Sequence, residues 1–392
     1  MINFVHYTPT EVVFGKDTEL QAGAYAKKWG ASRVLLVFGK GSAVRSGLVG
    51  RVEDSLAKEG IASLQFGGVQ ANPLLSYAEV GIREALDFGA DMILAVGGGS
   101  VIDTAKAIAH GAANPDLKLW DIWTRKVEIT KTLPVGVVLT IPAAGSEMSN
   151  SAVLTNEAEG RKAGLNFDLN RVKFAIMNPA LAATLPKYQL GCGVTDIMMH
   201  TLERYFIPDS HAMITDEIAE GLLRTVIANG RIIAEHPEDY DAMAEIMWCS
   251  SISHNGMTEL GRRKDFCVHK FGHALSARYN AAHGASLAAV WGAWAKSVYK
   301  LAVPRFAQYA RKVWNITEHN DEKAALKGIE ATISYFHEIG MPTSLKELGL
   351  SPSDQEFRDL ALNATMNGTI TICVITPIDD KKAEEIFRAA AE

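Results

Sequence analysis

The sequence predicts an α/β domain followed by an all-helical domain. In the first half of the 392-residue chain, short apolar runs rich in β-branched residues alternate with amphipathic stretches. The runs at residues 33–38, 92–96 and 135–141 are apolar almost throughout, as expected of parallel strands that are covered on both faces. After about Pro186, apolar residues recur at helical spacing and strand-like runs are scarce. We therefore predict one domain over residues 1–186 and a second over residues 187–392.

The order of the expected elements indicates βαβ units, and so a Rossmann-like parallel sheet with right-handed crossovers. Residues 3–7 and 11–14 favour two short strands that form a hairpin around Thr8 and Pro9. Residues 62–66 favour a weaker strand. Helices are expected at residues 44–59 and 77–88, and after the glycine run that ends at Ser100, to about His110. In the second half, helices are expected at residues 189–205, 216–234, 240–257, 268–277, 285–299, 305–313 and 322–339, and residues 369–374 are ambiguous.

Composition excludes several classes of protein. The 39 basic and 45 acidic residues give a net charge of −6, which argues against a nucleic-acid-binding protein. The chain contains no apolar run long enough for a membrane span, and its first residues lack the pattern of a signal peptide. Its four cysteines are scattered and form no CxxC motif, as in a reduced cytoplasmic protein. An intracellular enzyme is the expectation that remains.

A glycine run follows the predicted strand at residues 92–96. Gly97, Gly98, Gly99 and Ser100 precede a predicted helix that contains Asp103. Glycines let a phosphate approach the backbone, and the start of a helix offers unpaired N–H groups. The run is neither a Walker A motif nor GxGxxG, and the alternative is a tight turn without a ligand.

A second turn, Gly39-Lys40-Gly41-Ser42, follows the strand at residues 33–38. In dinucleotide sites an acidic residue at such a strand end binds the ribose hydroxyls and repels a 2′-phosphate. Here the strand end is small and cationic, which leaves room and charge for a 2′-phosphate. The alternative is an ordinary surface turn.

Histidines and one aspartate have the spacing of a metal site. Asp196 and His200 lie four residues apart on a predicted helix, as do His269 and His273, and His283 follows after a possible turn. Imidazoles with one carboxylate suit a divalent ion such as Fe²⁺ or Zn²⁺. The alternative is a set of unrelated surface or core histidines. The remaining histidines are expected to be structural, and these are His6, His110, His211, His236, His254, His319 and His337.

Several motifs together resemble the iron-containing, group III alcohol dehydrogenases, and within them the NADPH-dependent butanol dehydrogenase and aldehyde reductase branch. The resemblance covers nearly the whole chain. The motifs are FGKGS from Phe38, Asn72-Pro73, GGGSVIDTAK from Gly97, TIPAAGSE from Thr140, NPALAATLP from Asn178, DIMMH from Asp196 and HKFGHALSARYNAAHG from His269.

The resemblance implies reversible hydride transfer between a nicotinamide cofactor and small primary alcohols or aldehydes such as butanol and butanal. It implies an active site in a cleft between the domains, one divalent metal on Asp196, His200, His269 and His283, and a catalytic position for His273 beside nicotinamide and substrate. The cofactor would be NADP(H) in preference to NAD(H), because Gly39 stands where NAD-preferring members commonly have Asp. Implied cofactor-binding residues are Gly39, Lys40, Gly41, Ser42, Asn72, Gly97, Gly98, Gly99, Ser100, Asp103, Thr140, Ser146 and Lys162. A homodimer would form by pairing of the N-terminal strands at residues 3–7 and 11–14.

Two other functions stay open at this point. One is a metal- and NAD-dependent lyase or cyclase resembling dehydroquinate synthase, which would need a basic lining for a phosphorylated substrate. The aromatic residues Phe266, Phe271, Trp291 and Trp294 argue against such a lining, whereas Arg262, Arg263 and Lys264 favour it. The other is a non-catalytic binding protein that retains the fold.

Overall fold

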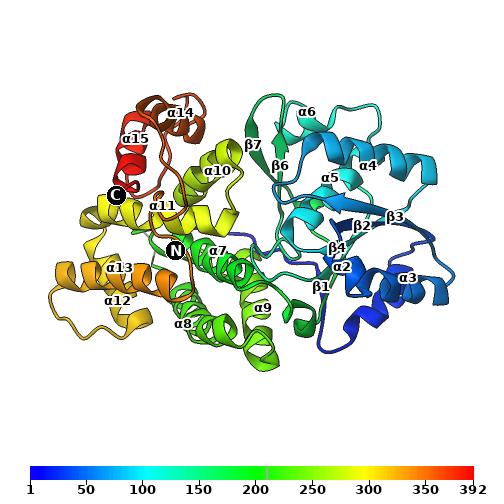
Figure 1. Cartoon of the computed structure of the whole chain (residues 1–392), viewed down its shortest axis with the longest axis horizontal. Helices are drawn as coiled ribbons and strands as arrows, with labels where there is room; N and C mark the ends of the chain where they lie inside the picture. The colour runs from blue at the N-terminus through cyan, green and yellow to red at the C-terminus, as the bar shows by residue number, and fades with distance from the viewer. Residues whose placement is uncertain (209–210) are drawn as a thin grey trace. The chain divides into compact units, whose positions relative to one another are not determined.

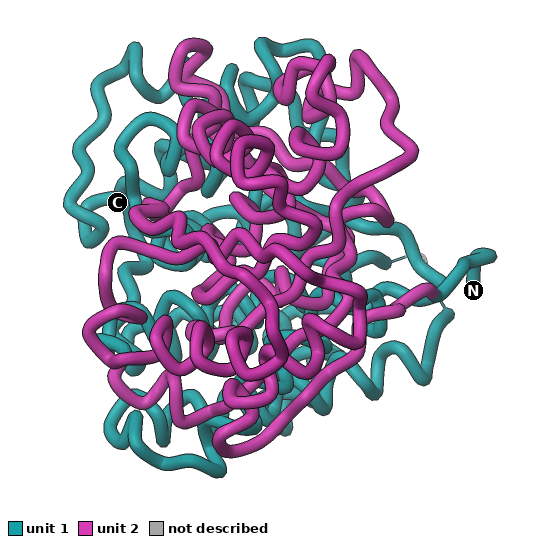
Figure 2. Tube along the Cα trace, turned by 90° about the vertical axis from the view of Figure 1, so that its right-hand side faces the viewer, with its two compact units in different colours: residues 1–6, 185–392 teal, residues 7–184 magenta. Residues whose placement is uncertain are grey.

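The computed structural model describes residues 1–208 and 211–392 (Figure 1). The chain forms two compact units (Figure 2). Tyr7–Thr184 make up the first, an α/β unit, and Leu185–Glu392 together with Met1–His6 make up the second, a helical unit. The domain bounds of 1–186 and 187–392 stay a prediction.

The α/β unit alternates strands and helices in the order expected for βαβ units. Its strands are β1 (Glu11–Phe14), β2 (Arg33–Gly39), β3 (Ala62–Val69), β4 (Met92–Gly97), β5 (Val135–Leu139), β6 (Ser151–Asn156), β7 (Arg161–Asn166) and β8 (Phe174–Met177). Its helices are α1 (Ala22–Lys28), α2 (Ser42–Arg45), α3 (Leu48–Lys58), α4 (Leu75–Phe88), α5 (Gly99–Ala113) and α6 (Leu119–Trp123), with short 3₁₀ turns at η1 (Thr18–Gln21), η2 (Asp168–Asn170) and η3 (Pro179–Ala182).

Six strands of the described residues form a sheet in the order β1-β8-β5-β4-β2-β3. All neighbouring strands run parallel. Every residue of β4 is buried, as a central parallel strand requires. Alternate side chains such as Leu36 and Leu94 share a core with α1 and α3. In addition, α4 contacts β2, and α5 contacts both β2 and β4 (Figure 1). The predicted parallel α/β architecture is confirmed.

The predicted N-terminal hairpin is wrong. Residues 1–10 carry neither helix nor strand, and β1 pairs in parallel with β8, with Val12 opposite Ala175. Because β8 is buried throughout, its backbone groups need a partner on each side, and β1 supplies one of them. β8 is only four residues long and has no clear signal in the sequence, so residues 11–14 were predicted to pair with their nearest neighbour instead.

A second small sheet was also missed. β6 and β7 form an antiparallel pair in which Leu154 lies opposite Ala163. β6 is buried at alternate positions, as in a strand with one covered face.

The helical unit follows the apolar periodicity of the second half. Its helices are α7 (Lys187–Tyr205), α8 (Met213–Glu235), α9 (Tyr240–His254), α10 (Cys267–Tyr279), α11 (His283–Val298), α12 (Val303–Trp314), α13 (Asp321–Glu338), α14 (Asp354–Ala364) and α15 (Asp380–Ala389), with a 3₁₀ turn at η4 (Tyr299–Leu301). α14 and α15 were not predicted from the sequence. The ambiguous residues 369–374 contain one isolated bridge, between Ile372 and Ile378. Within the described ranges, no helix has the length and apolar character needed to cross a membrane.

A buried histidine ties α5 to η2 in the α/β unit. His110 is fully buried, and its Nε2 lies 2.7 Å from the Oδ1 of Asn170. The amide nitrogen of Asn170 already donates to two carbonyl groups, so its Oδ1 accepts from His110. Burial lowers the pKa of His110 from 6.5 to about 4, although the hydrogen bond to Asn170 acts in the opposite direction. The protein therefore keeps this imidazole neutral.

We expect His110 to make the fold acid-sensitive. Its folded-state pKa is depressed, so stability is fully present above pH 6.5 and falls as the pH drops toward 4, while the unfolded chain takes up a proton that the folded chain does not. At pH 5 this difference in proton uptake lowers the free energy of unfolding by about 2 kcal/mol relative to its value well above pH 6.5. The variant His110→Gln should lose less stability than the wild type between pH 7 and pH 5 in denaturant unfolding. An equal loss in both proteins would contradict this role.

Candidate functional site

Two of the predicted metal ligands lie on one face of α7. Asp196 and His200 are one helical turn apart, and both side chains are buried. The Nε2 of His200 lies 3.5 Å from the Oδ1 of Asp196. Spacing of four residues therefore brings the carboxylate and the imidazole together, as the sequence indicated.

α10 and α11 bring two more imidazoles to the same oxygen. The Nε2 atoms of His269 and His283 each lie 3.6 Å from the Oδ1 of Asp196. His283 is the first residue of α11, which follows the left-handed turn at Asn280. A Cβ on Gly284 would lie 2.1 Å from the carbonyl oxygen of Cys192 in α7. Only glycine lets the start of α11 approach α7 this closely, and this approach places His283 beside Asp196.

The donor atoms of this cluster fit a divalent cation. One ligand atom each from Asp196, His200 and His269 lies within 4.8 Å of the others. The Oδ1 of Asp196 and the Nε2 of His269 are buried and have no hydrogen-bond partner in the described part of the chain. Buried polar atoms normally have hydrogen-bond partners. A cation shared between these two facing atoms would explain why neither has one. Carboxylate and imidazole donors suit Fe²⁺ and Zn²⁺.

Opposite charges in the cluster shift the pKa values of the proposed ligands. Burial lowers the pKa of His269, but Glu203 and Asp196 outweigh it and raise the value to about 9. Burial raises the pKa of Asp196, but the nearby histidines, His283 foremost, bring it below its usual value. Protons and a metal ion would therefore compete for the same donors.

His200 has a different set of neighbours. Burial, followed by the charges of His254, His269 and Arg204, holds its pKa well below the usual value. Arg204 donates to the carbonyl oxygen of His200 and also to Glu259 at 2.8 Å. The ring of His254 stacks on that of His200, with centroids 4.0 Å apart. The prediction that His254 is only structural overlooked this contact, because no local spacing links residues 200 and 254.

His273 lies beside the cluster. Its ring centroid is 5.4 Å from that of His283 and 6.3 Å from that of His269. His273 is partly exposed, whereas Asp196, His200 and His269 are buried. The role of His273 stays a prediction.

The aromatic residues near the cluster have separate roles. Phe266 packs edge-on against His200 and His269. Phe271, Trp291 and Trp294 are fully buried core residues.

Two of the three basic residues that favoured a lyase form ion pairs. Arg262 is buried and binds Asp216. Lys264 pairs with Glu259. These contacts engage two of the three side chains that favoured a phosphorylated substrate.

In the α/β unit, the predicted cofactor-binding residues gather at the carboxyl ends of the strands. Gly97 ends β4, and α5 begins at Gly99. Gly39 ends β2, and Gly41 precedes α2. The strand order reverses between β2 and β4, and ligands of open α/β sheets bind at such a switch point.

Hydrogen bonds fix several of these residues to one another. Ser146 donates to Asp103 at 2.7 Å, and the buried Lys106 donates to both the carbonyl oxygen and the hydroxyl of Ser146. Burial lowers the pKa of Lys106 to about 8 and raises the pKa of Asp103. The charge of Asp103 acts against the shift of Lys106, and the charge of Lys106 acts against the shift of Asp103. Lys106, which the sequence analysis did not select, therefore holds the loop that carries Ser146.

The other predicted residues border the same region. Lys162 of β7 donates to Asn72 at 2.9 Å, and the backbone N–H of Thr140 donates to the carbonyl oxygen of Gly97 at 3.1 Å. The exposed side chain of Lys40 donates to Gln70 at 3.3 Å. A Cβ added at Gly99 would meet no atom within 4 Å, which leaves open space beside the first turn of α5.

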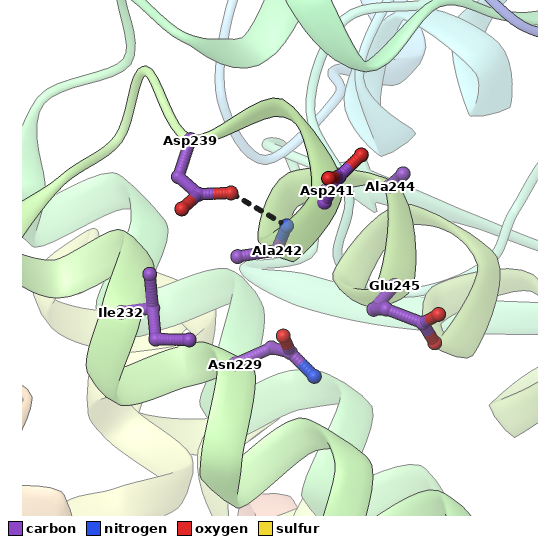
Figure 3. A pocket seen from close by; sticks show the side chains of 7 residues that line it. All are labelled: Asn229, Ile232, Asp239, Asp241, Ala242, Ala244 and Glu245. Atoms are coloured by element: carbon purple, nitrogen blue, oxygen red, sulfur yellow. Dashed lines mark hydrogen bonds between the residues drawn. The ribbon is translucent and has the colours of Figure 1, made fainter.

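A separate surface pocket of about 380 Å³ lies between α8 and α9 (Figure 3). Asn229 and Ile232 line it from α8, and Asp239 accepts a hydrogen bond from the N–H of Ala242 at the start of α9. None of the predicted site residues lines this pocket, so the candidate site rests on the histidine cluster and the strand ends.

The fold and these two groups of residues define a dinucleotide- and metal-dependent class of enzyme, and comparison with known proteins identifies the family. The model for iron-containing alcohol dehydrogenases matches residues 9–179, and the model for the C-terminal part of the Fe-containing alcohol dehydrogenase family matches residues 192–391. The chain belongs to the iron-containing alcohol dehydrogenase family, and it is an NAD(P)-dependent alcohol dehydrogenase. Membership implies a nicotinamide cofactor and a divalent metal.

The names of similar relatives specify different nicotinamide cofactors. The chain is 37% identical to NADH-dependent butanol dehydrogenase A of Clostridium acetobutylicum over 99% of both chains. It is 36% identical to the NADPH-dependent aldehyde reductase YqhD of Escherichia coli over 90% of this chain and 91% of that protein. The crystal structure of NADH-dependent butanol dehydrogenase A from Thermotoga maritima superposes with a TM-score of 0.96 at 36% identity, covering 100% of this chain and 99% of the other.

Proposed function

We propose that this enzyme reduces small aldehydes such as butanal to primary alcohols, and oxidises the alcohols in reverse, with NADP(H) preferred over NAD(H) and with Fe²⁺ or Zn²⁺ as its metal. One observation supports the metal chemistry above all. Three imidazole Nε2 atoms lie 3.5 to 3.6 Å from a single buried carboxylate oxygen. The relatives named as butanol dehydrogenase and aldehyde reductase support the substrate class.

The proposed metal ligands are Asp196, His200, His269 and His283. When bound, a divalent cation supplies a Lewis acid for the substrate oxygen, and a reduced nicotinamide supplies the hydride. Asp196 provides the one negative charge among the ligands. Phe266, which packs against His200 and His269, shields their rings from water on one side.

The proposed role of His273 is to hold the proton that the alcohol oxygen gains in reduction and loses in oxidation. Its ring lies beside His283 but is more accessible than the buried ligands. A general acid and base needs both proximity to the reacting oxygen and exchange with solvent. The position of His273 is suited to both.

The proposed dinucleotide site comprises Gly39, Lys40, Gly41, Ser42, Asn72, Gly97, Gly98, Gly99, Ser100, Asp103, Thr140, Ser146 and Lys162. The preference for NADP(H) rests on the turn after β2. Gly39 brings no carboxylate there, and Lys40 is exposed. The guanidinium of Arg45 lies 2.9 Å from the position of a Cβ on Gly41, which adds a second cation. Two cations and no acidic side chain favour a 2′-phosphate.

We also propose that the protein is a cytoplasmic homodimer. Each subunit would consist of the two predicted domains, 1–186 and 187–392. Ile2, Phe4 and Val5 are at least 49% exposed on a segment that forms neither helix nor strand. Pairing of this segment between two copies would cover the apolar side chains. Four free thiols support a reducing compartment.

Removal of a ligand tests the metal assignment. We expect Asp196→Ala and His283→Ala to lose stoichiometric metal and NADPH-dependent reduction of butanal, because each removes a donor from the cluster. Metal analysis, circular dichroism and NADPH oxidation before and after chelation provide the measurements. His236→Ala, an exposed histidine paired with Glu238, is the matched control and should keep its metal. Full turnover of either ligand variant after chelation would refute the assignment.

Substitution of Gly39 tests the cofactor preference. A Cβ at Gly39 would make only ordinary contacts, 3.7 Å to the carbonyl oxygen of Val69 and 4.0 Å to Val101, so Gly39→Asp fits sterically. Its carboxylate would repel a 2′-phosphate, and we expect the ratio of kcat/KM for NADPH to that for NADH to fall by about tenfold or more. Gly50→Asp is the control, because it adds the same charge in α3 where a Cβ meets no atom. An unchanged ratio for Gly39→Asp would show that this turn does not contact the phosphate.

Substitution of His273 tests its role in proton transfer. We expect His273→Ala to retain the metal but to change the pH dependence of kcat, since the proposed proton carrier is lost. Metal content and pH–rate profiles of the variant and the wild type are the measurements. Loss of metal from His273→Ala would instead make it a ligand.

A further inference from the structure

Glu203 lies on the same face of α7 as Asp196 and His200, one turn further along the helix. Its side chain is buried, with 1% of its surface exposed. Its hydrogen bonds reach the first turn of α10 rather than α7 itself. It accepts from the backbone N–H groups of Val268 and His269, the latter at 3.3 Å, and its Oε2 contacts the Nδ1 of His269.

Two carboxylates satisfy the start of α10. Asp265 accepts from the N–H groups of Phe266 and Cys267 at 2.8 and 3.1 Å. Glu203 accepts from the next two, those of Val268 and His269. The first amides of a helix have no partner within the helix, and negative charge is favourable there. Glu203 thus fixes the position of the helix start from which His269 projects.

The same carboxylate orients the ring of His269. As a hydrogen-bond acceptor facing Nδ1, Glu203 requires the hydrogen to be on Nδ1. The lone pair of a neutral ring is then on Nε2, which is buried and lies 3.6 Å from the Oδ1 of Asp196. A metal ion held by this cluster would use this lone pair, and ligand histidines held in this way by a carboxylate are more basic and better oriented.

We propose that Glu203 is the positioning residue that fixes the tautomer and the location of His269 and thereby sets the affinity of the protein for its divalent cation. The proposal rests on the function proposed above, in which His269 is a metal ligand. Glu203 does not contact the cation; it acts through His269.

The test is a titration of the full-length, metal-free protein with Co²⁺, followed by its visible absorption. We expect Glu203→Ala to bind Co²⁺ about 10- to 100-fold more weakly than the wild type. Glu203→Gln keeps an acceptor for the Nδ1 hydrogen but loses the charge, so its affinity should lie between the two. Among the exchangeable imidazole N–H signals of the Co²⁺-loaded wild type, one should be retained in Glu203→Gln and lost in Glu203→Ala.

Glu220→Gln is the matched control. Glu220 is another fully buried carboxylate, on α8, and it accepts from Tyr205 and Gln308. Its variant removes a buried charge without touching a proposed ligand and should leave the Co²⁺ affinity unchanged. If Glu220→Gln and Glu203→Gln lose the same affinity, Glu203 is a structural residue only and the proposal is overturned.

Asp196→Ala, titrated in parallel, separates this inference from the proposed function. If Asp196→Ala loses Co²⁺ while Glu203→Ala binds as tightly as the wild type, the metal centre stands and the role of Glu203 is overturned. If Asp196→Ala binds as tightly as the wild type, the metal centre itself is wrong and the role of Glu203 fails with it. Should Glu203→Ala not fold, the position of Glu203→Gln between the wild type and Asp196→Ala decides the question, and wild-type affinity in Glu203→Gln overturns the proposal.

Discussion

The buried carboxylate of Asp196 is the constraint on which the helical unit depends. An ionised carboxylate in a protein interior costs several kcal/mol unless nearby charges and donors compensate for it. Here compensation comes from imidazoles on α7, α10 and α11, whose Nε2 atoms all lie within 3.6 Å of one oxygen. The three helices must approach closely to achieve this. Gly284 and Gly272 allow it, since a Cβ on either would overlap a neighbouring helix.

In the α/β unit the corresponding constraint is the reversal of strand order between β2 and β4. Because both strands run in the same direction, their carboxyl ends open at one edge of the sheet, and the helices that follow leave in different directions. The loop after β5 must then be held over this edge. Lys106 does so by donating to the carbonyl oxygens of Ser146 and Ser151 and to the hydroxyl of Ser146. A buried cation is costly, and the neighbouring Asp103 offsets that cost.

The sequence predicted those features whose signal is local. β2 and β4 were found because each is a continuous apolar run, and Asp196 and His200 because helical spacing places them together. β8 is too short for a periodic signal, and its true partner β1 was therefore assigned to a hairpin. His254 stacks on His200 and Glu203 contacts His269, but neither pair is close in sequence. Such contacts follow from how α7, α9 and α10 pack, which residue spacing cannot reveal.

The placement of the two carboxylates around His269 has a chemical consequence. In the proposed centre Asp196 is the only carboxylate that would bind the cation directly, so the site keeps a net positive charge with which to polarise an oxygen. A second carboxylate among the ligands would neutralise that charge. Glu203 instead lies behind the imidazole, where it makes Nε2 a better donor without occupying a coordination position. The position of Glu203 one turn beyond His200 therefore strengthens metal binding while the electrophilic character of the site is preserved.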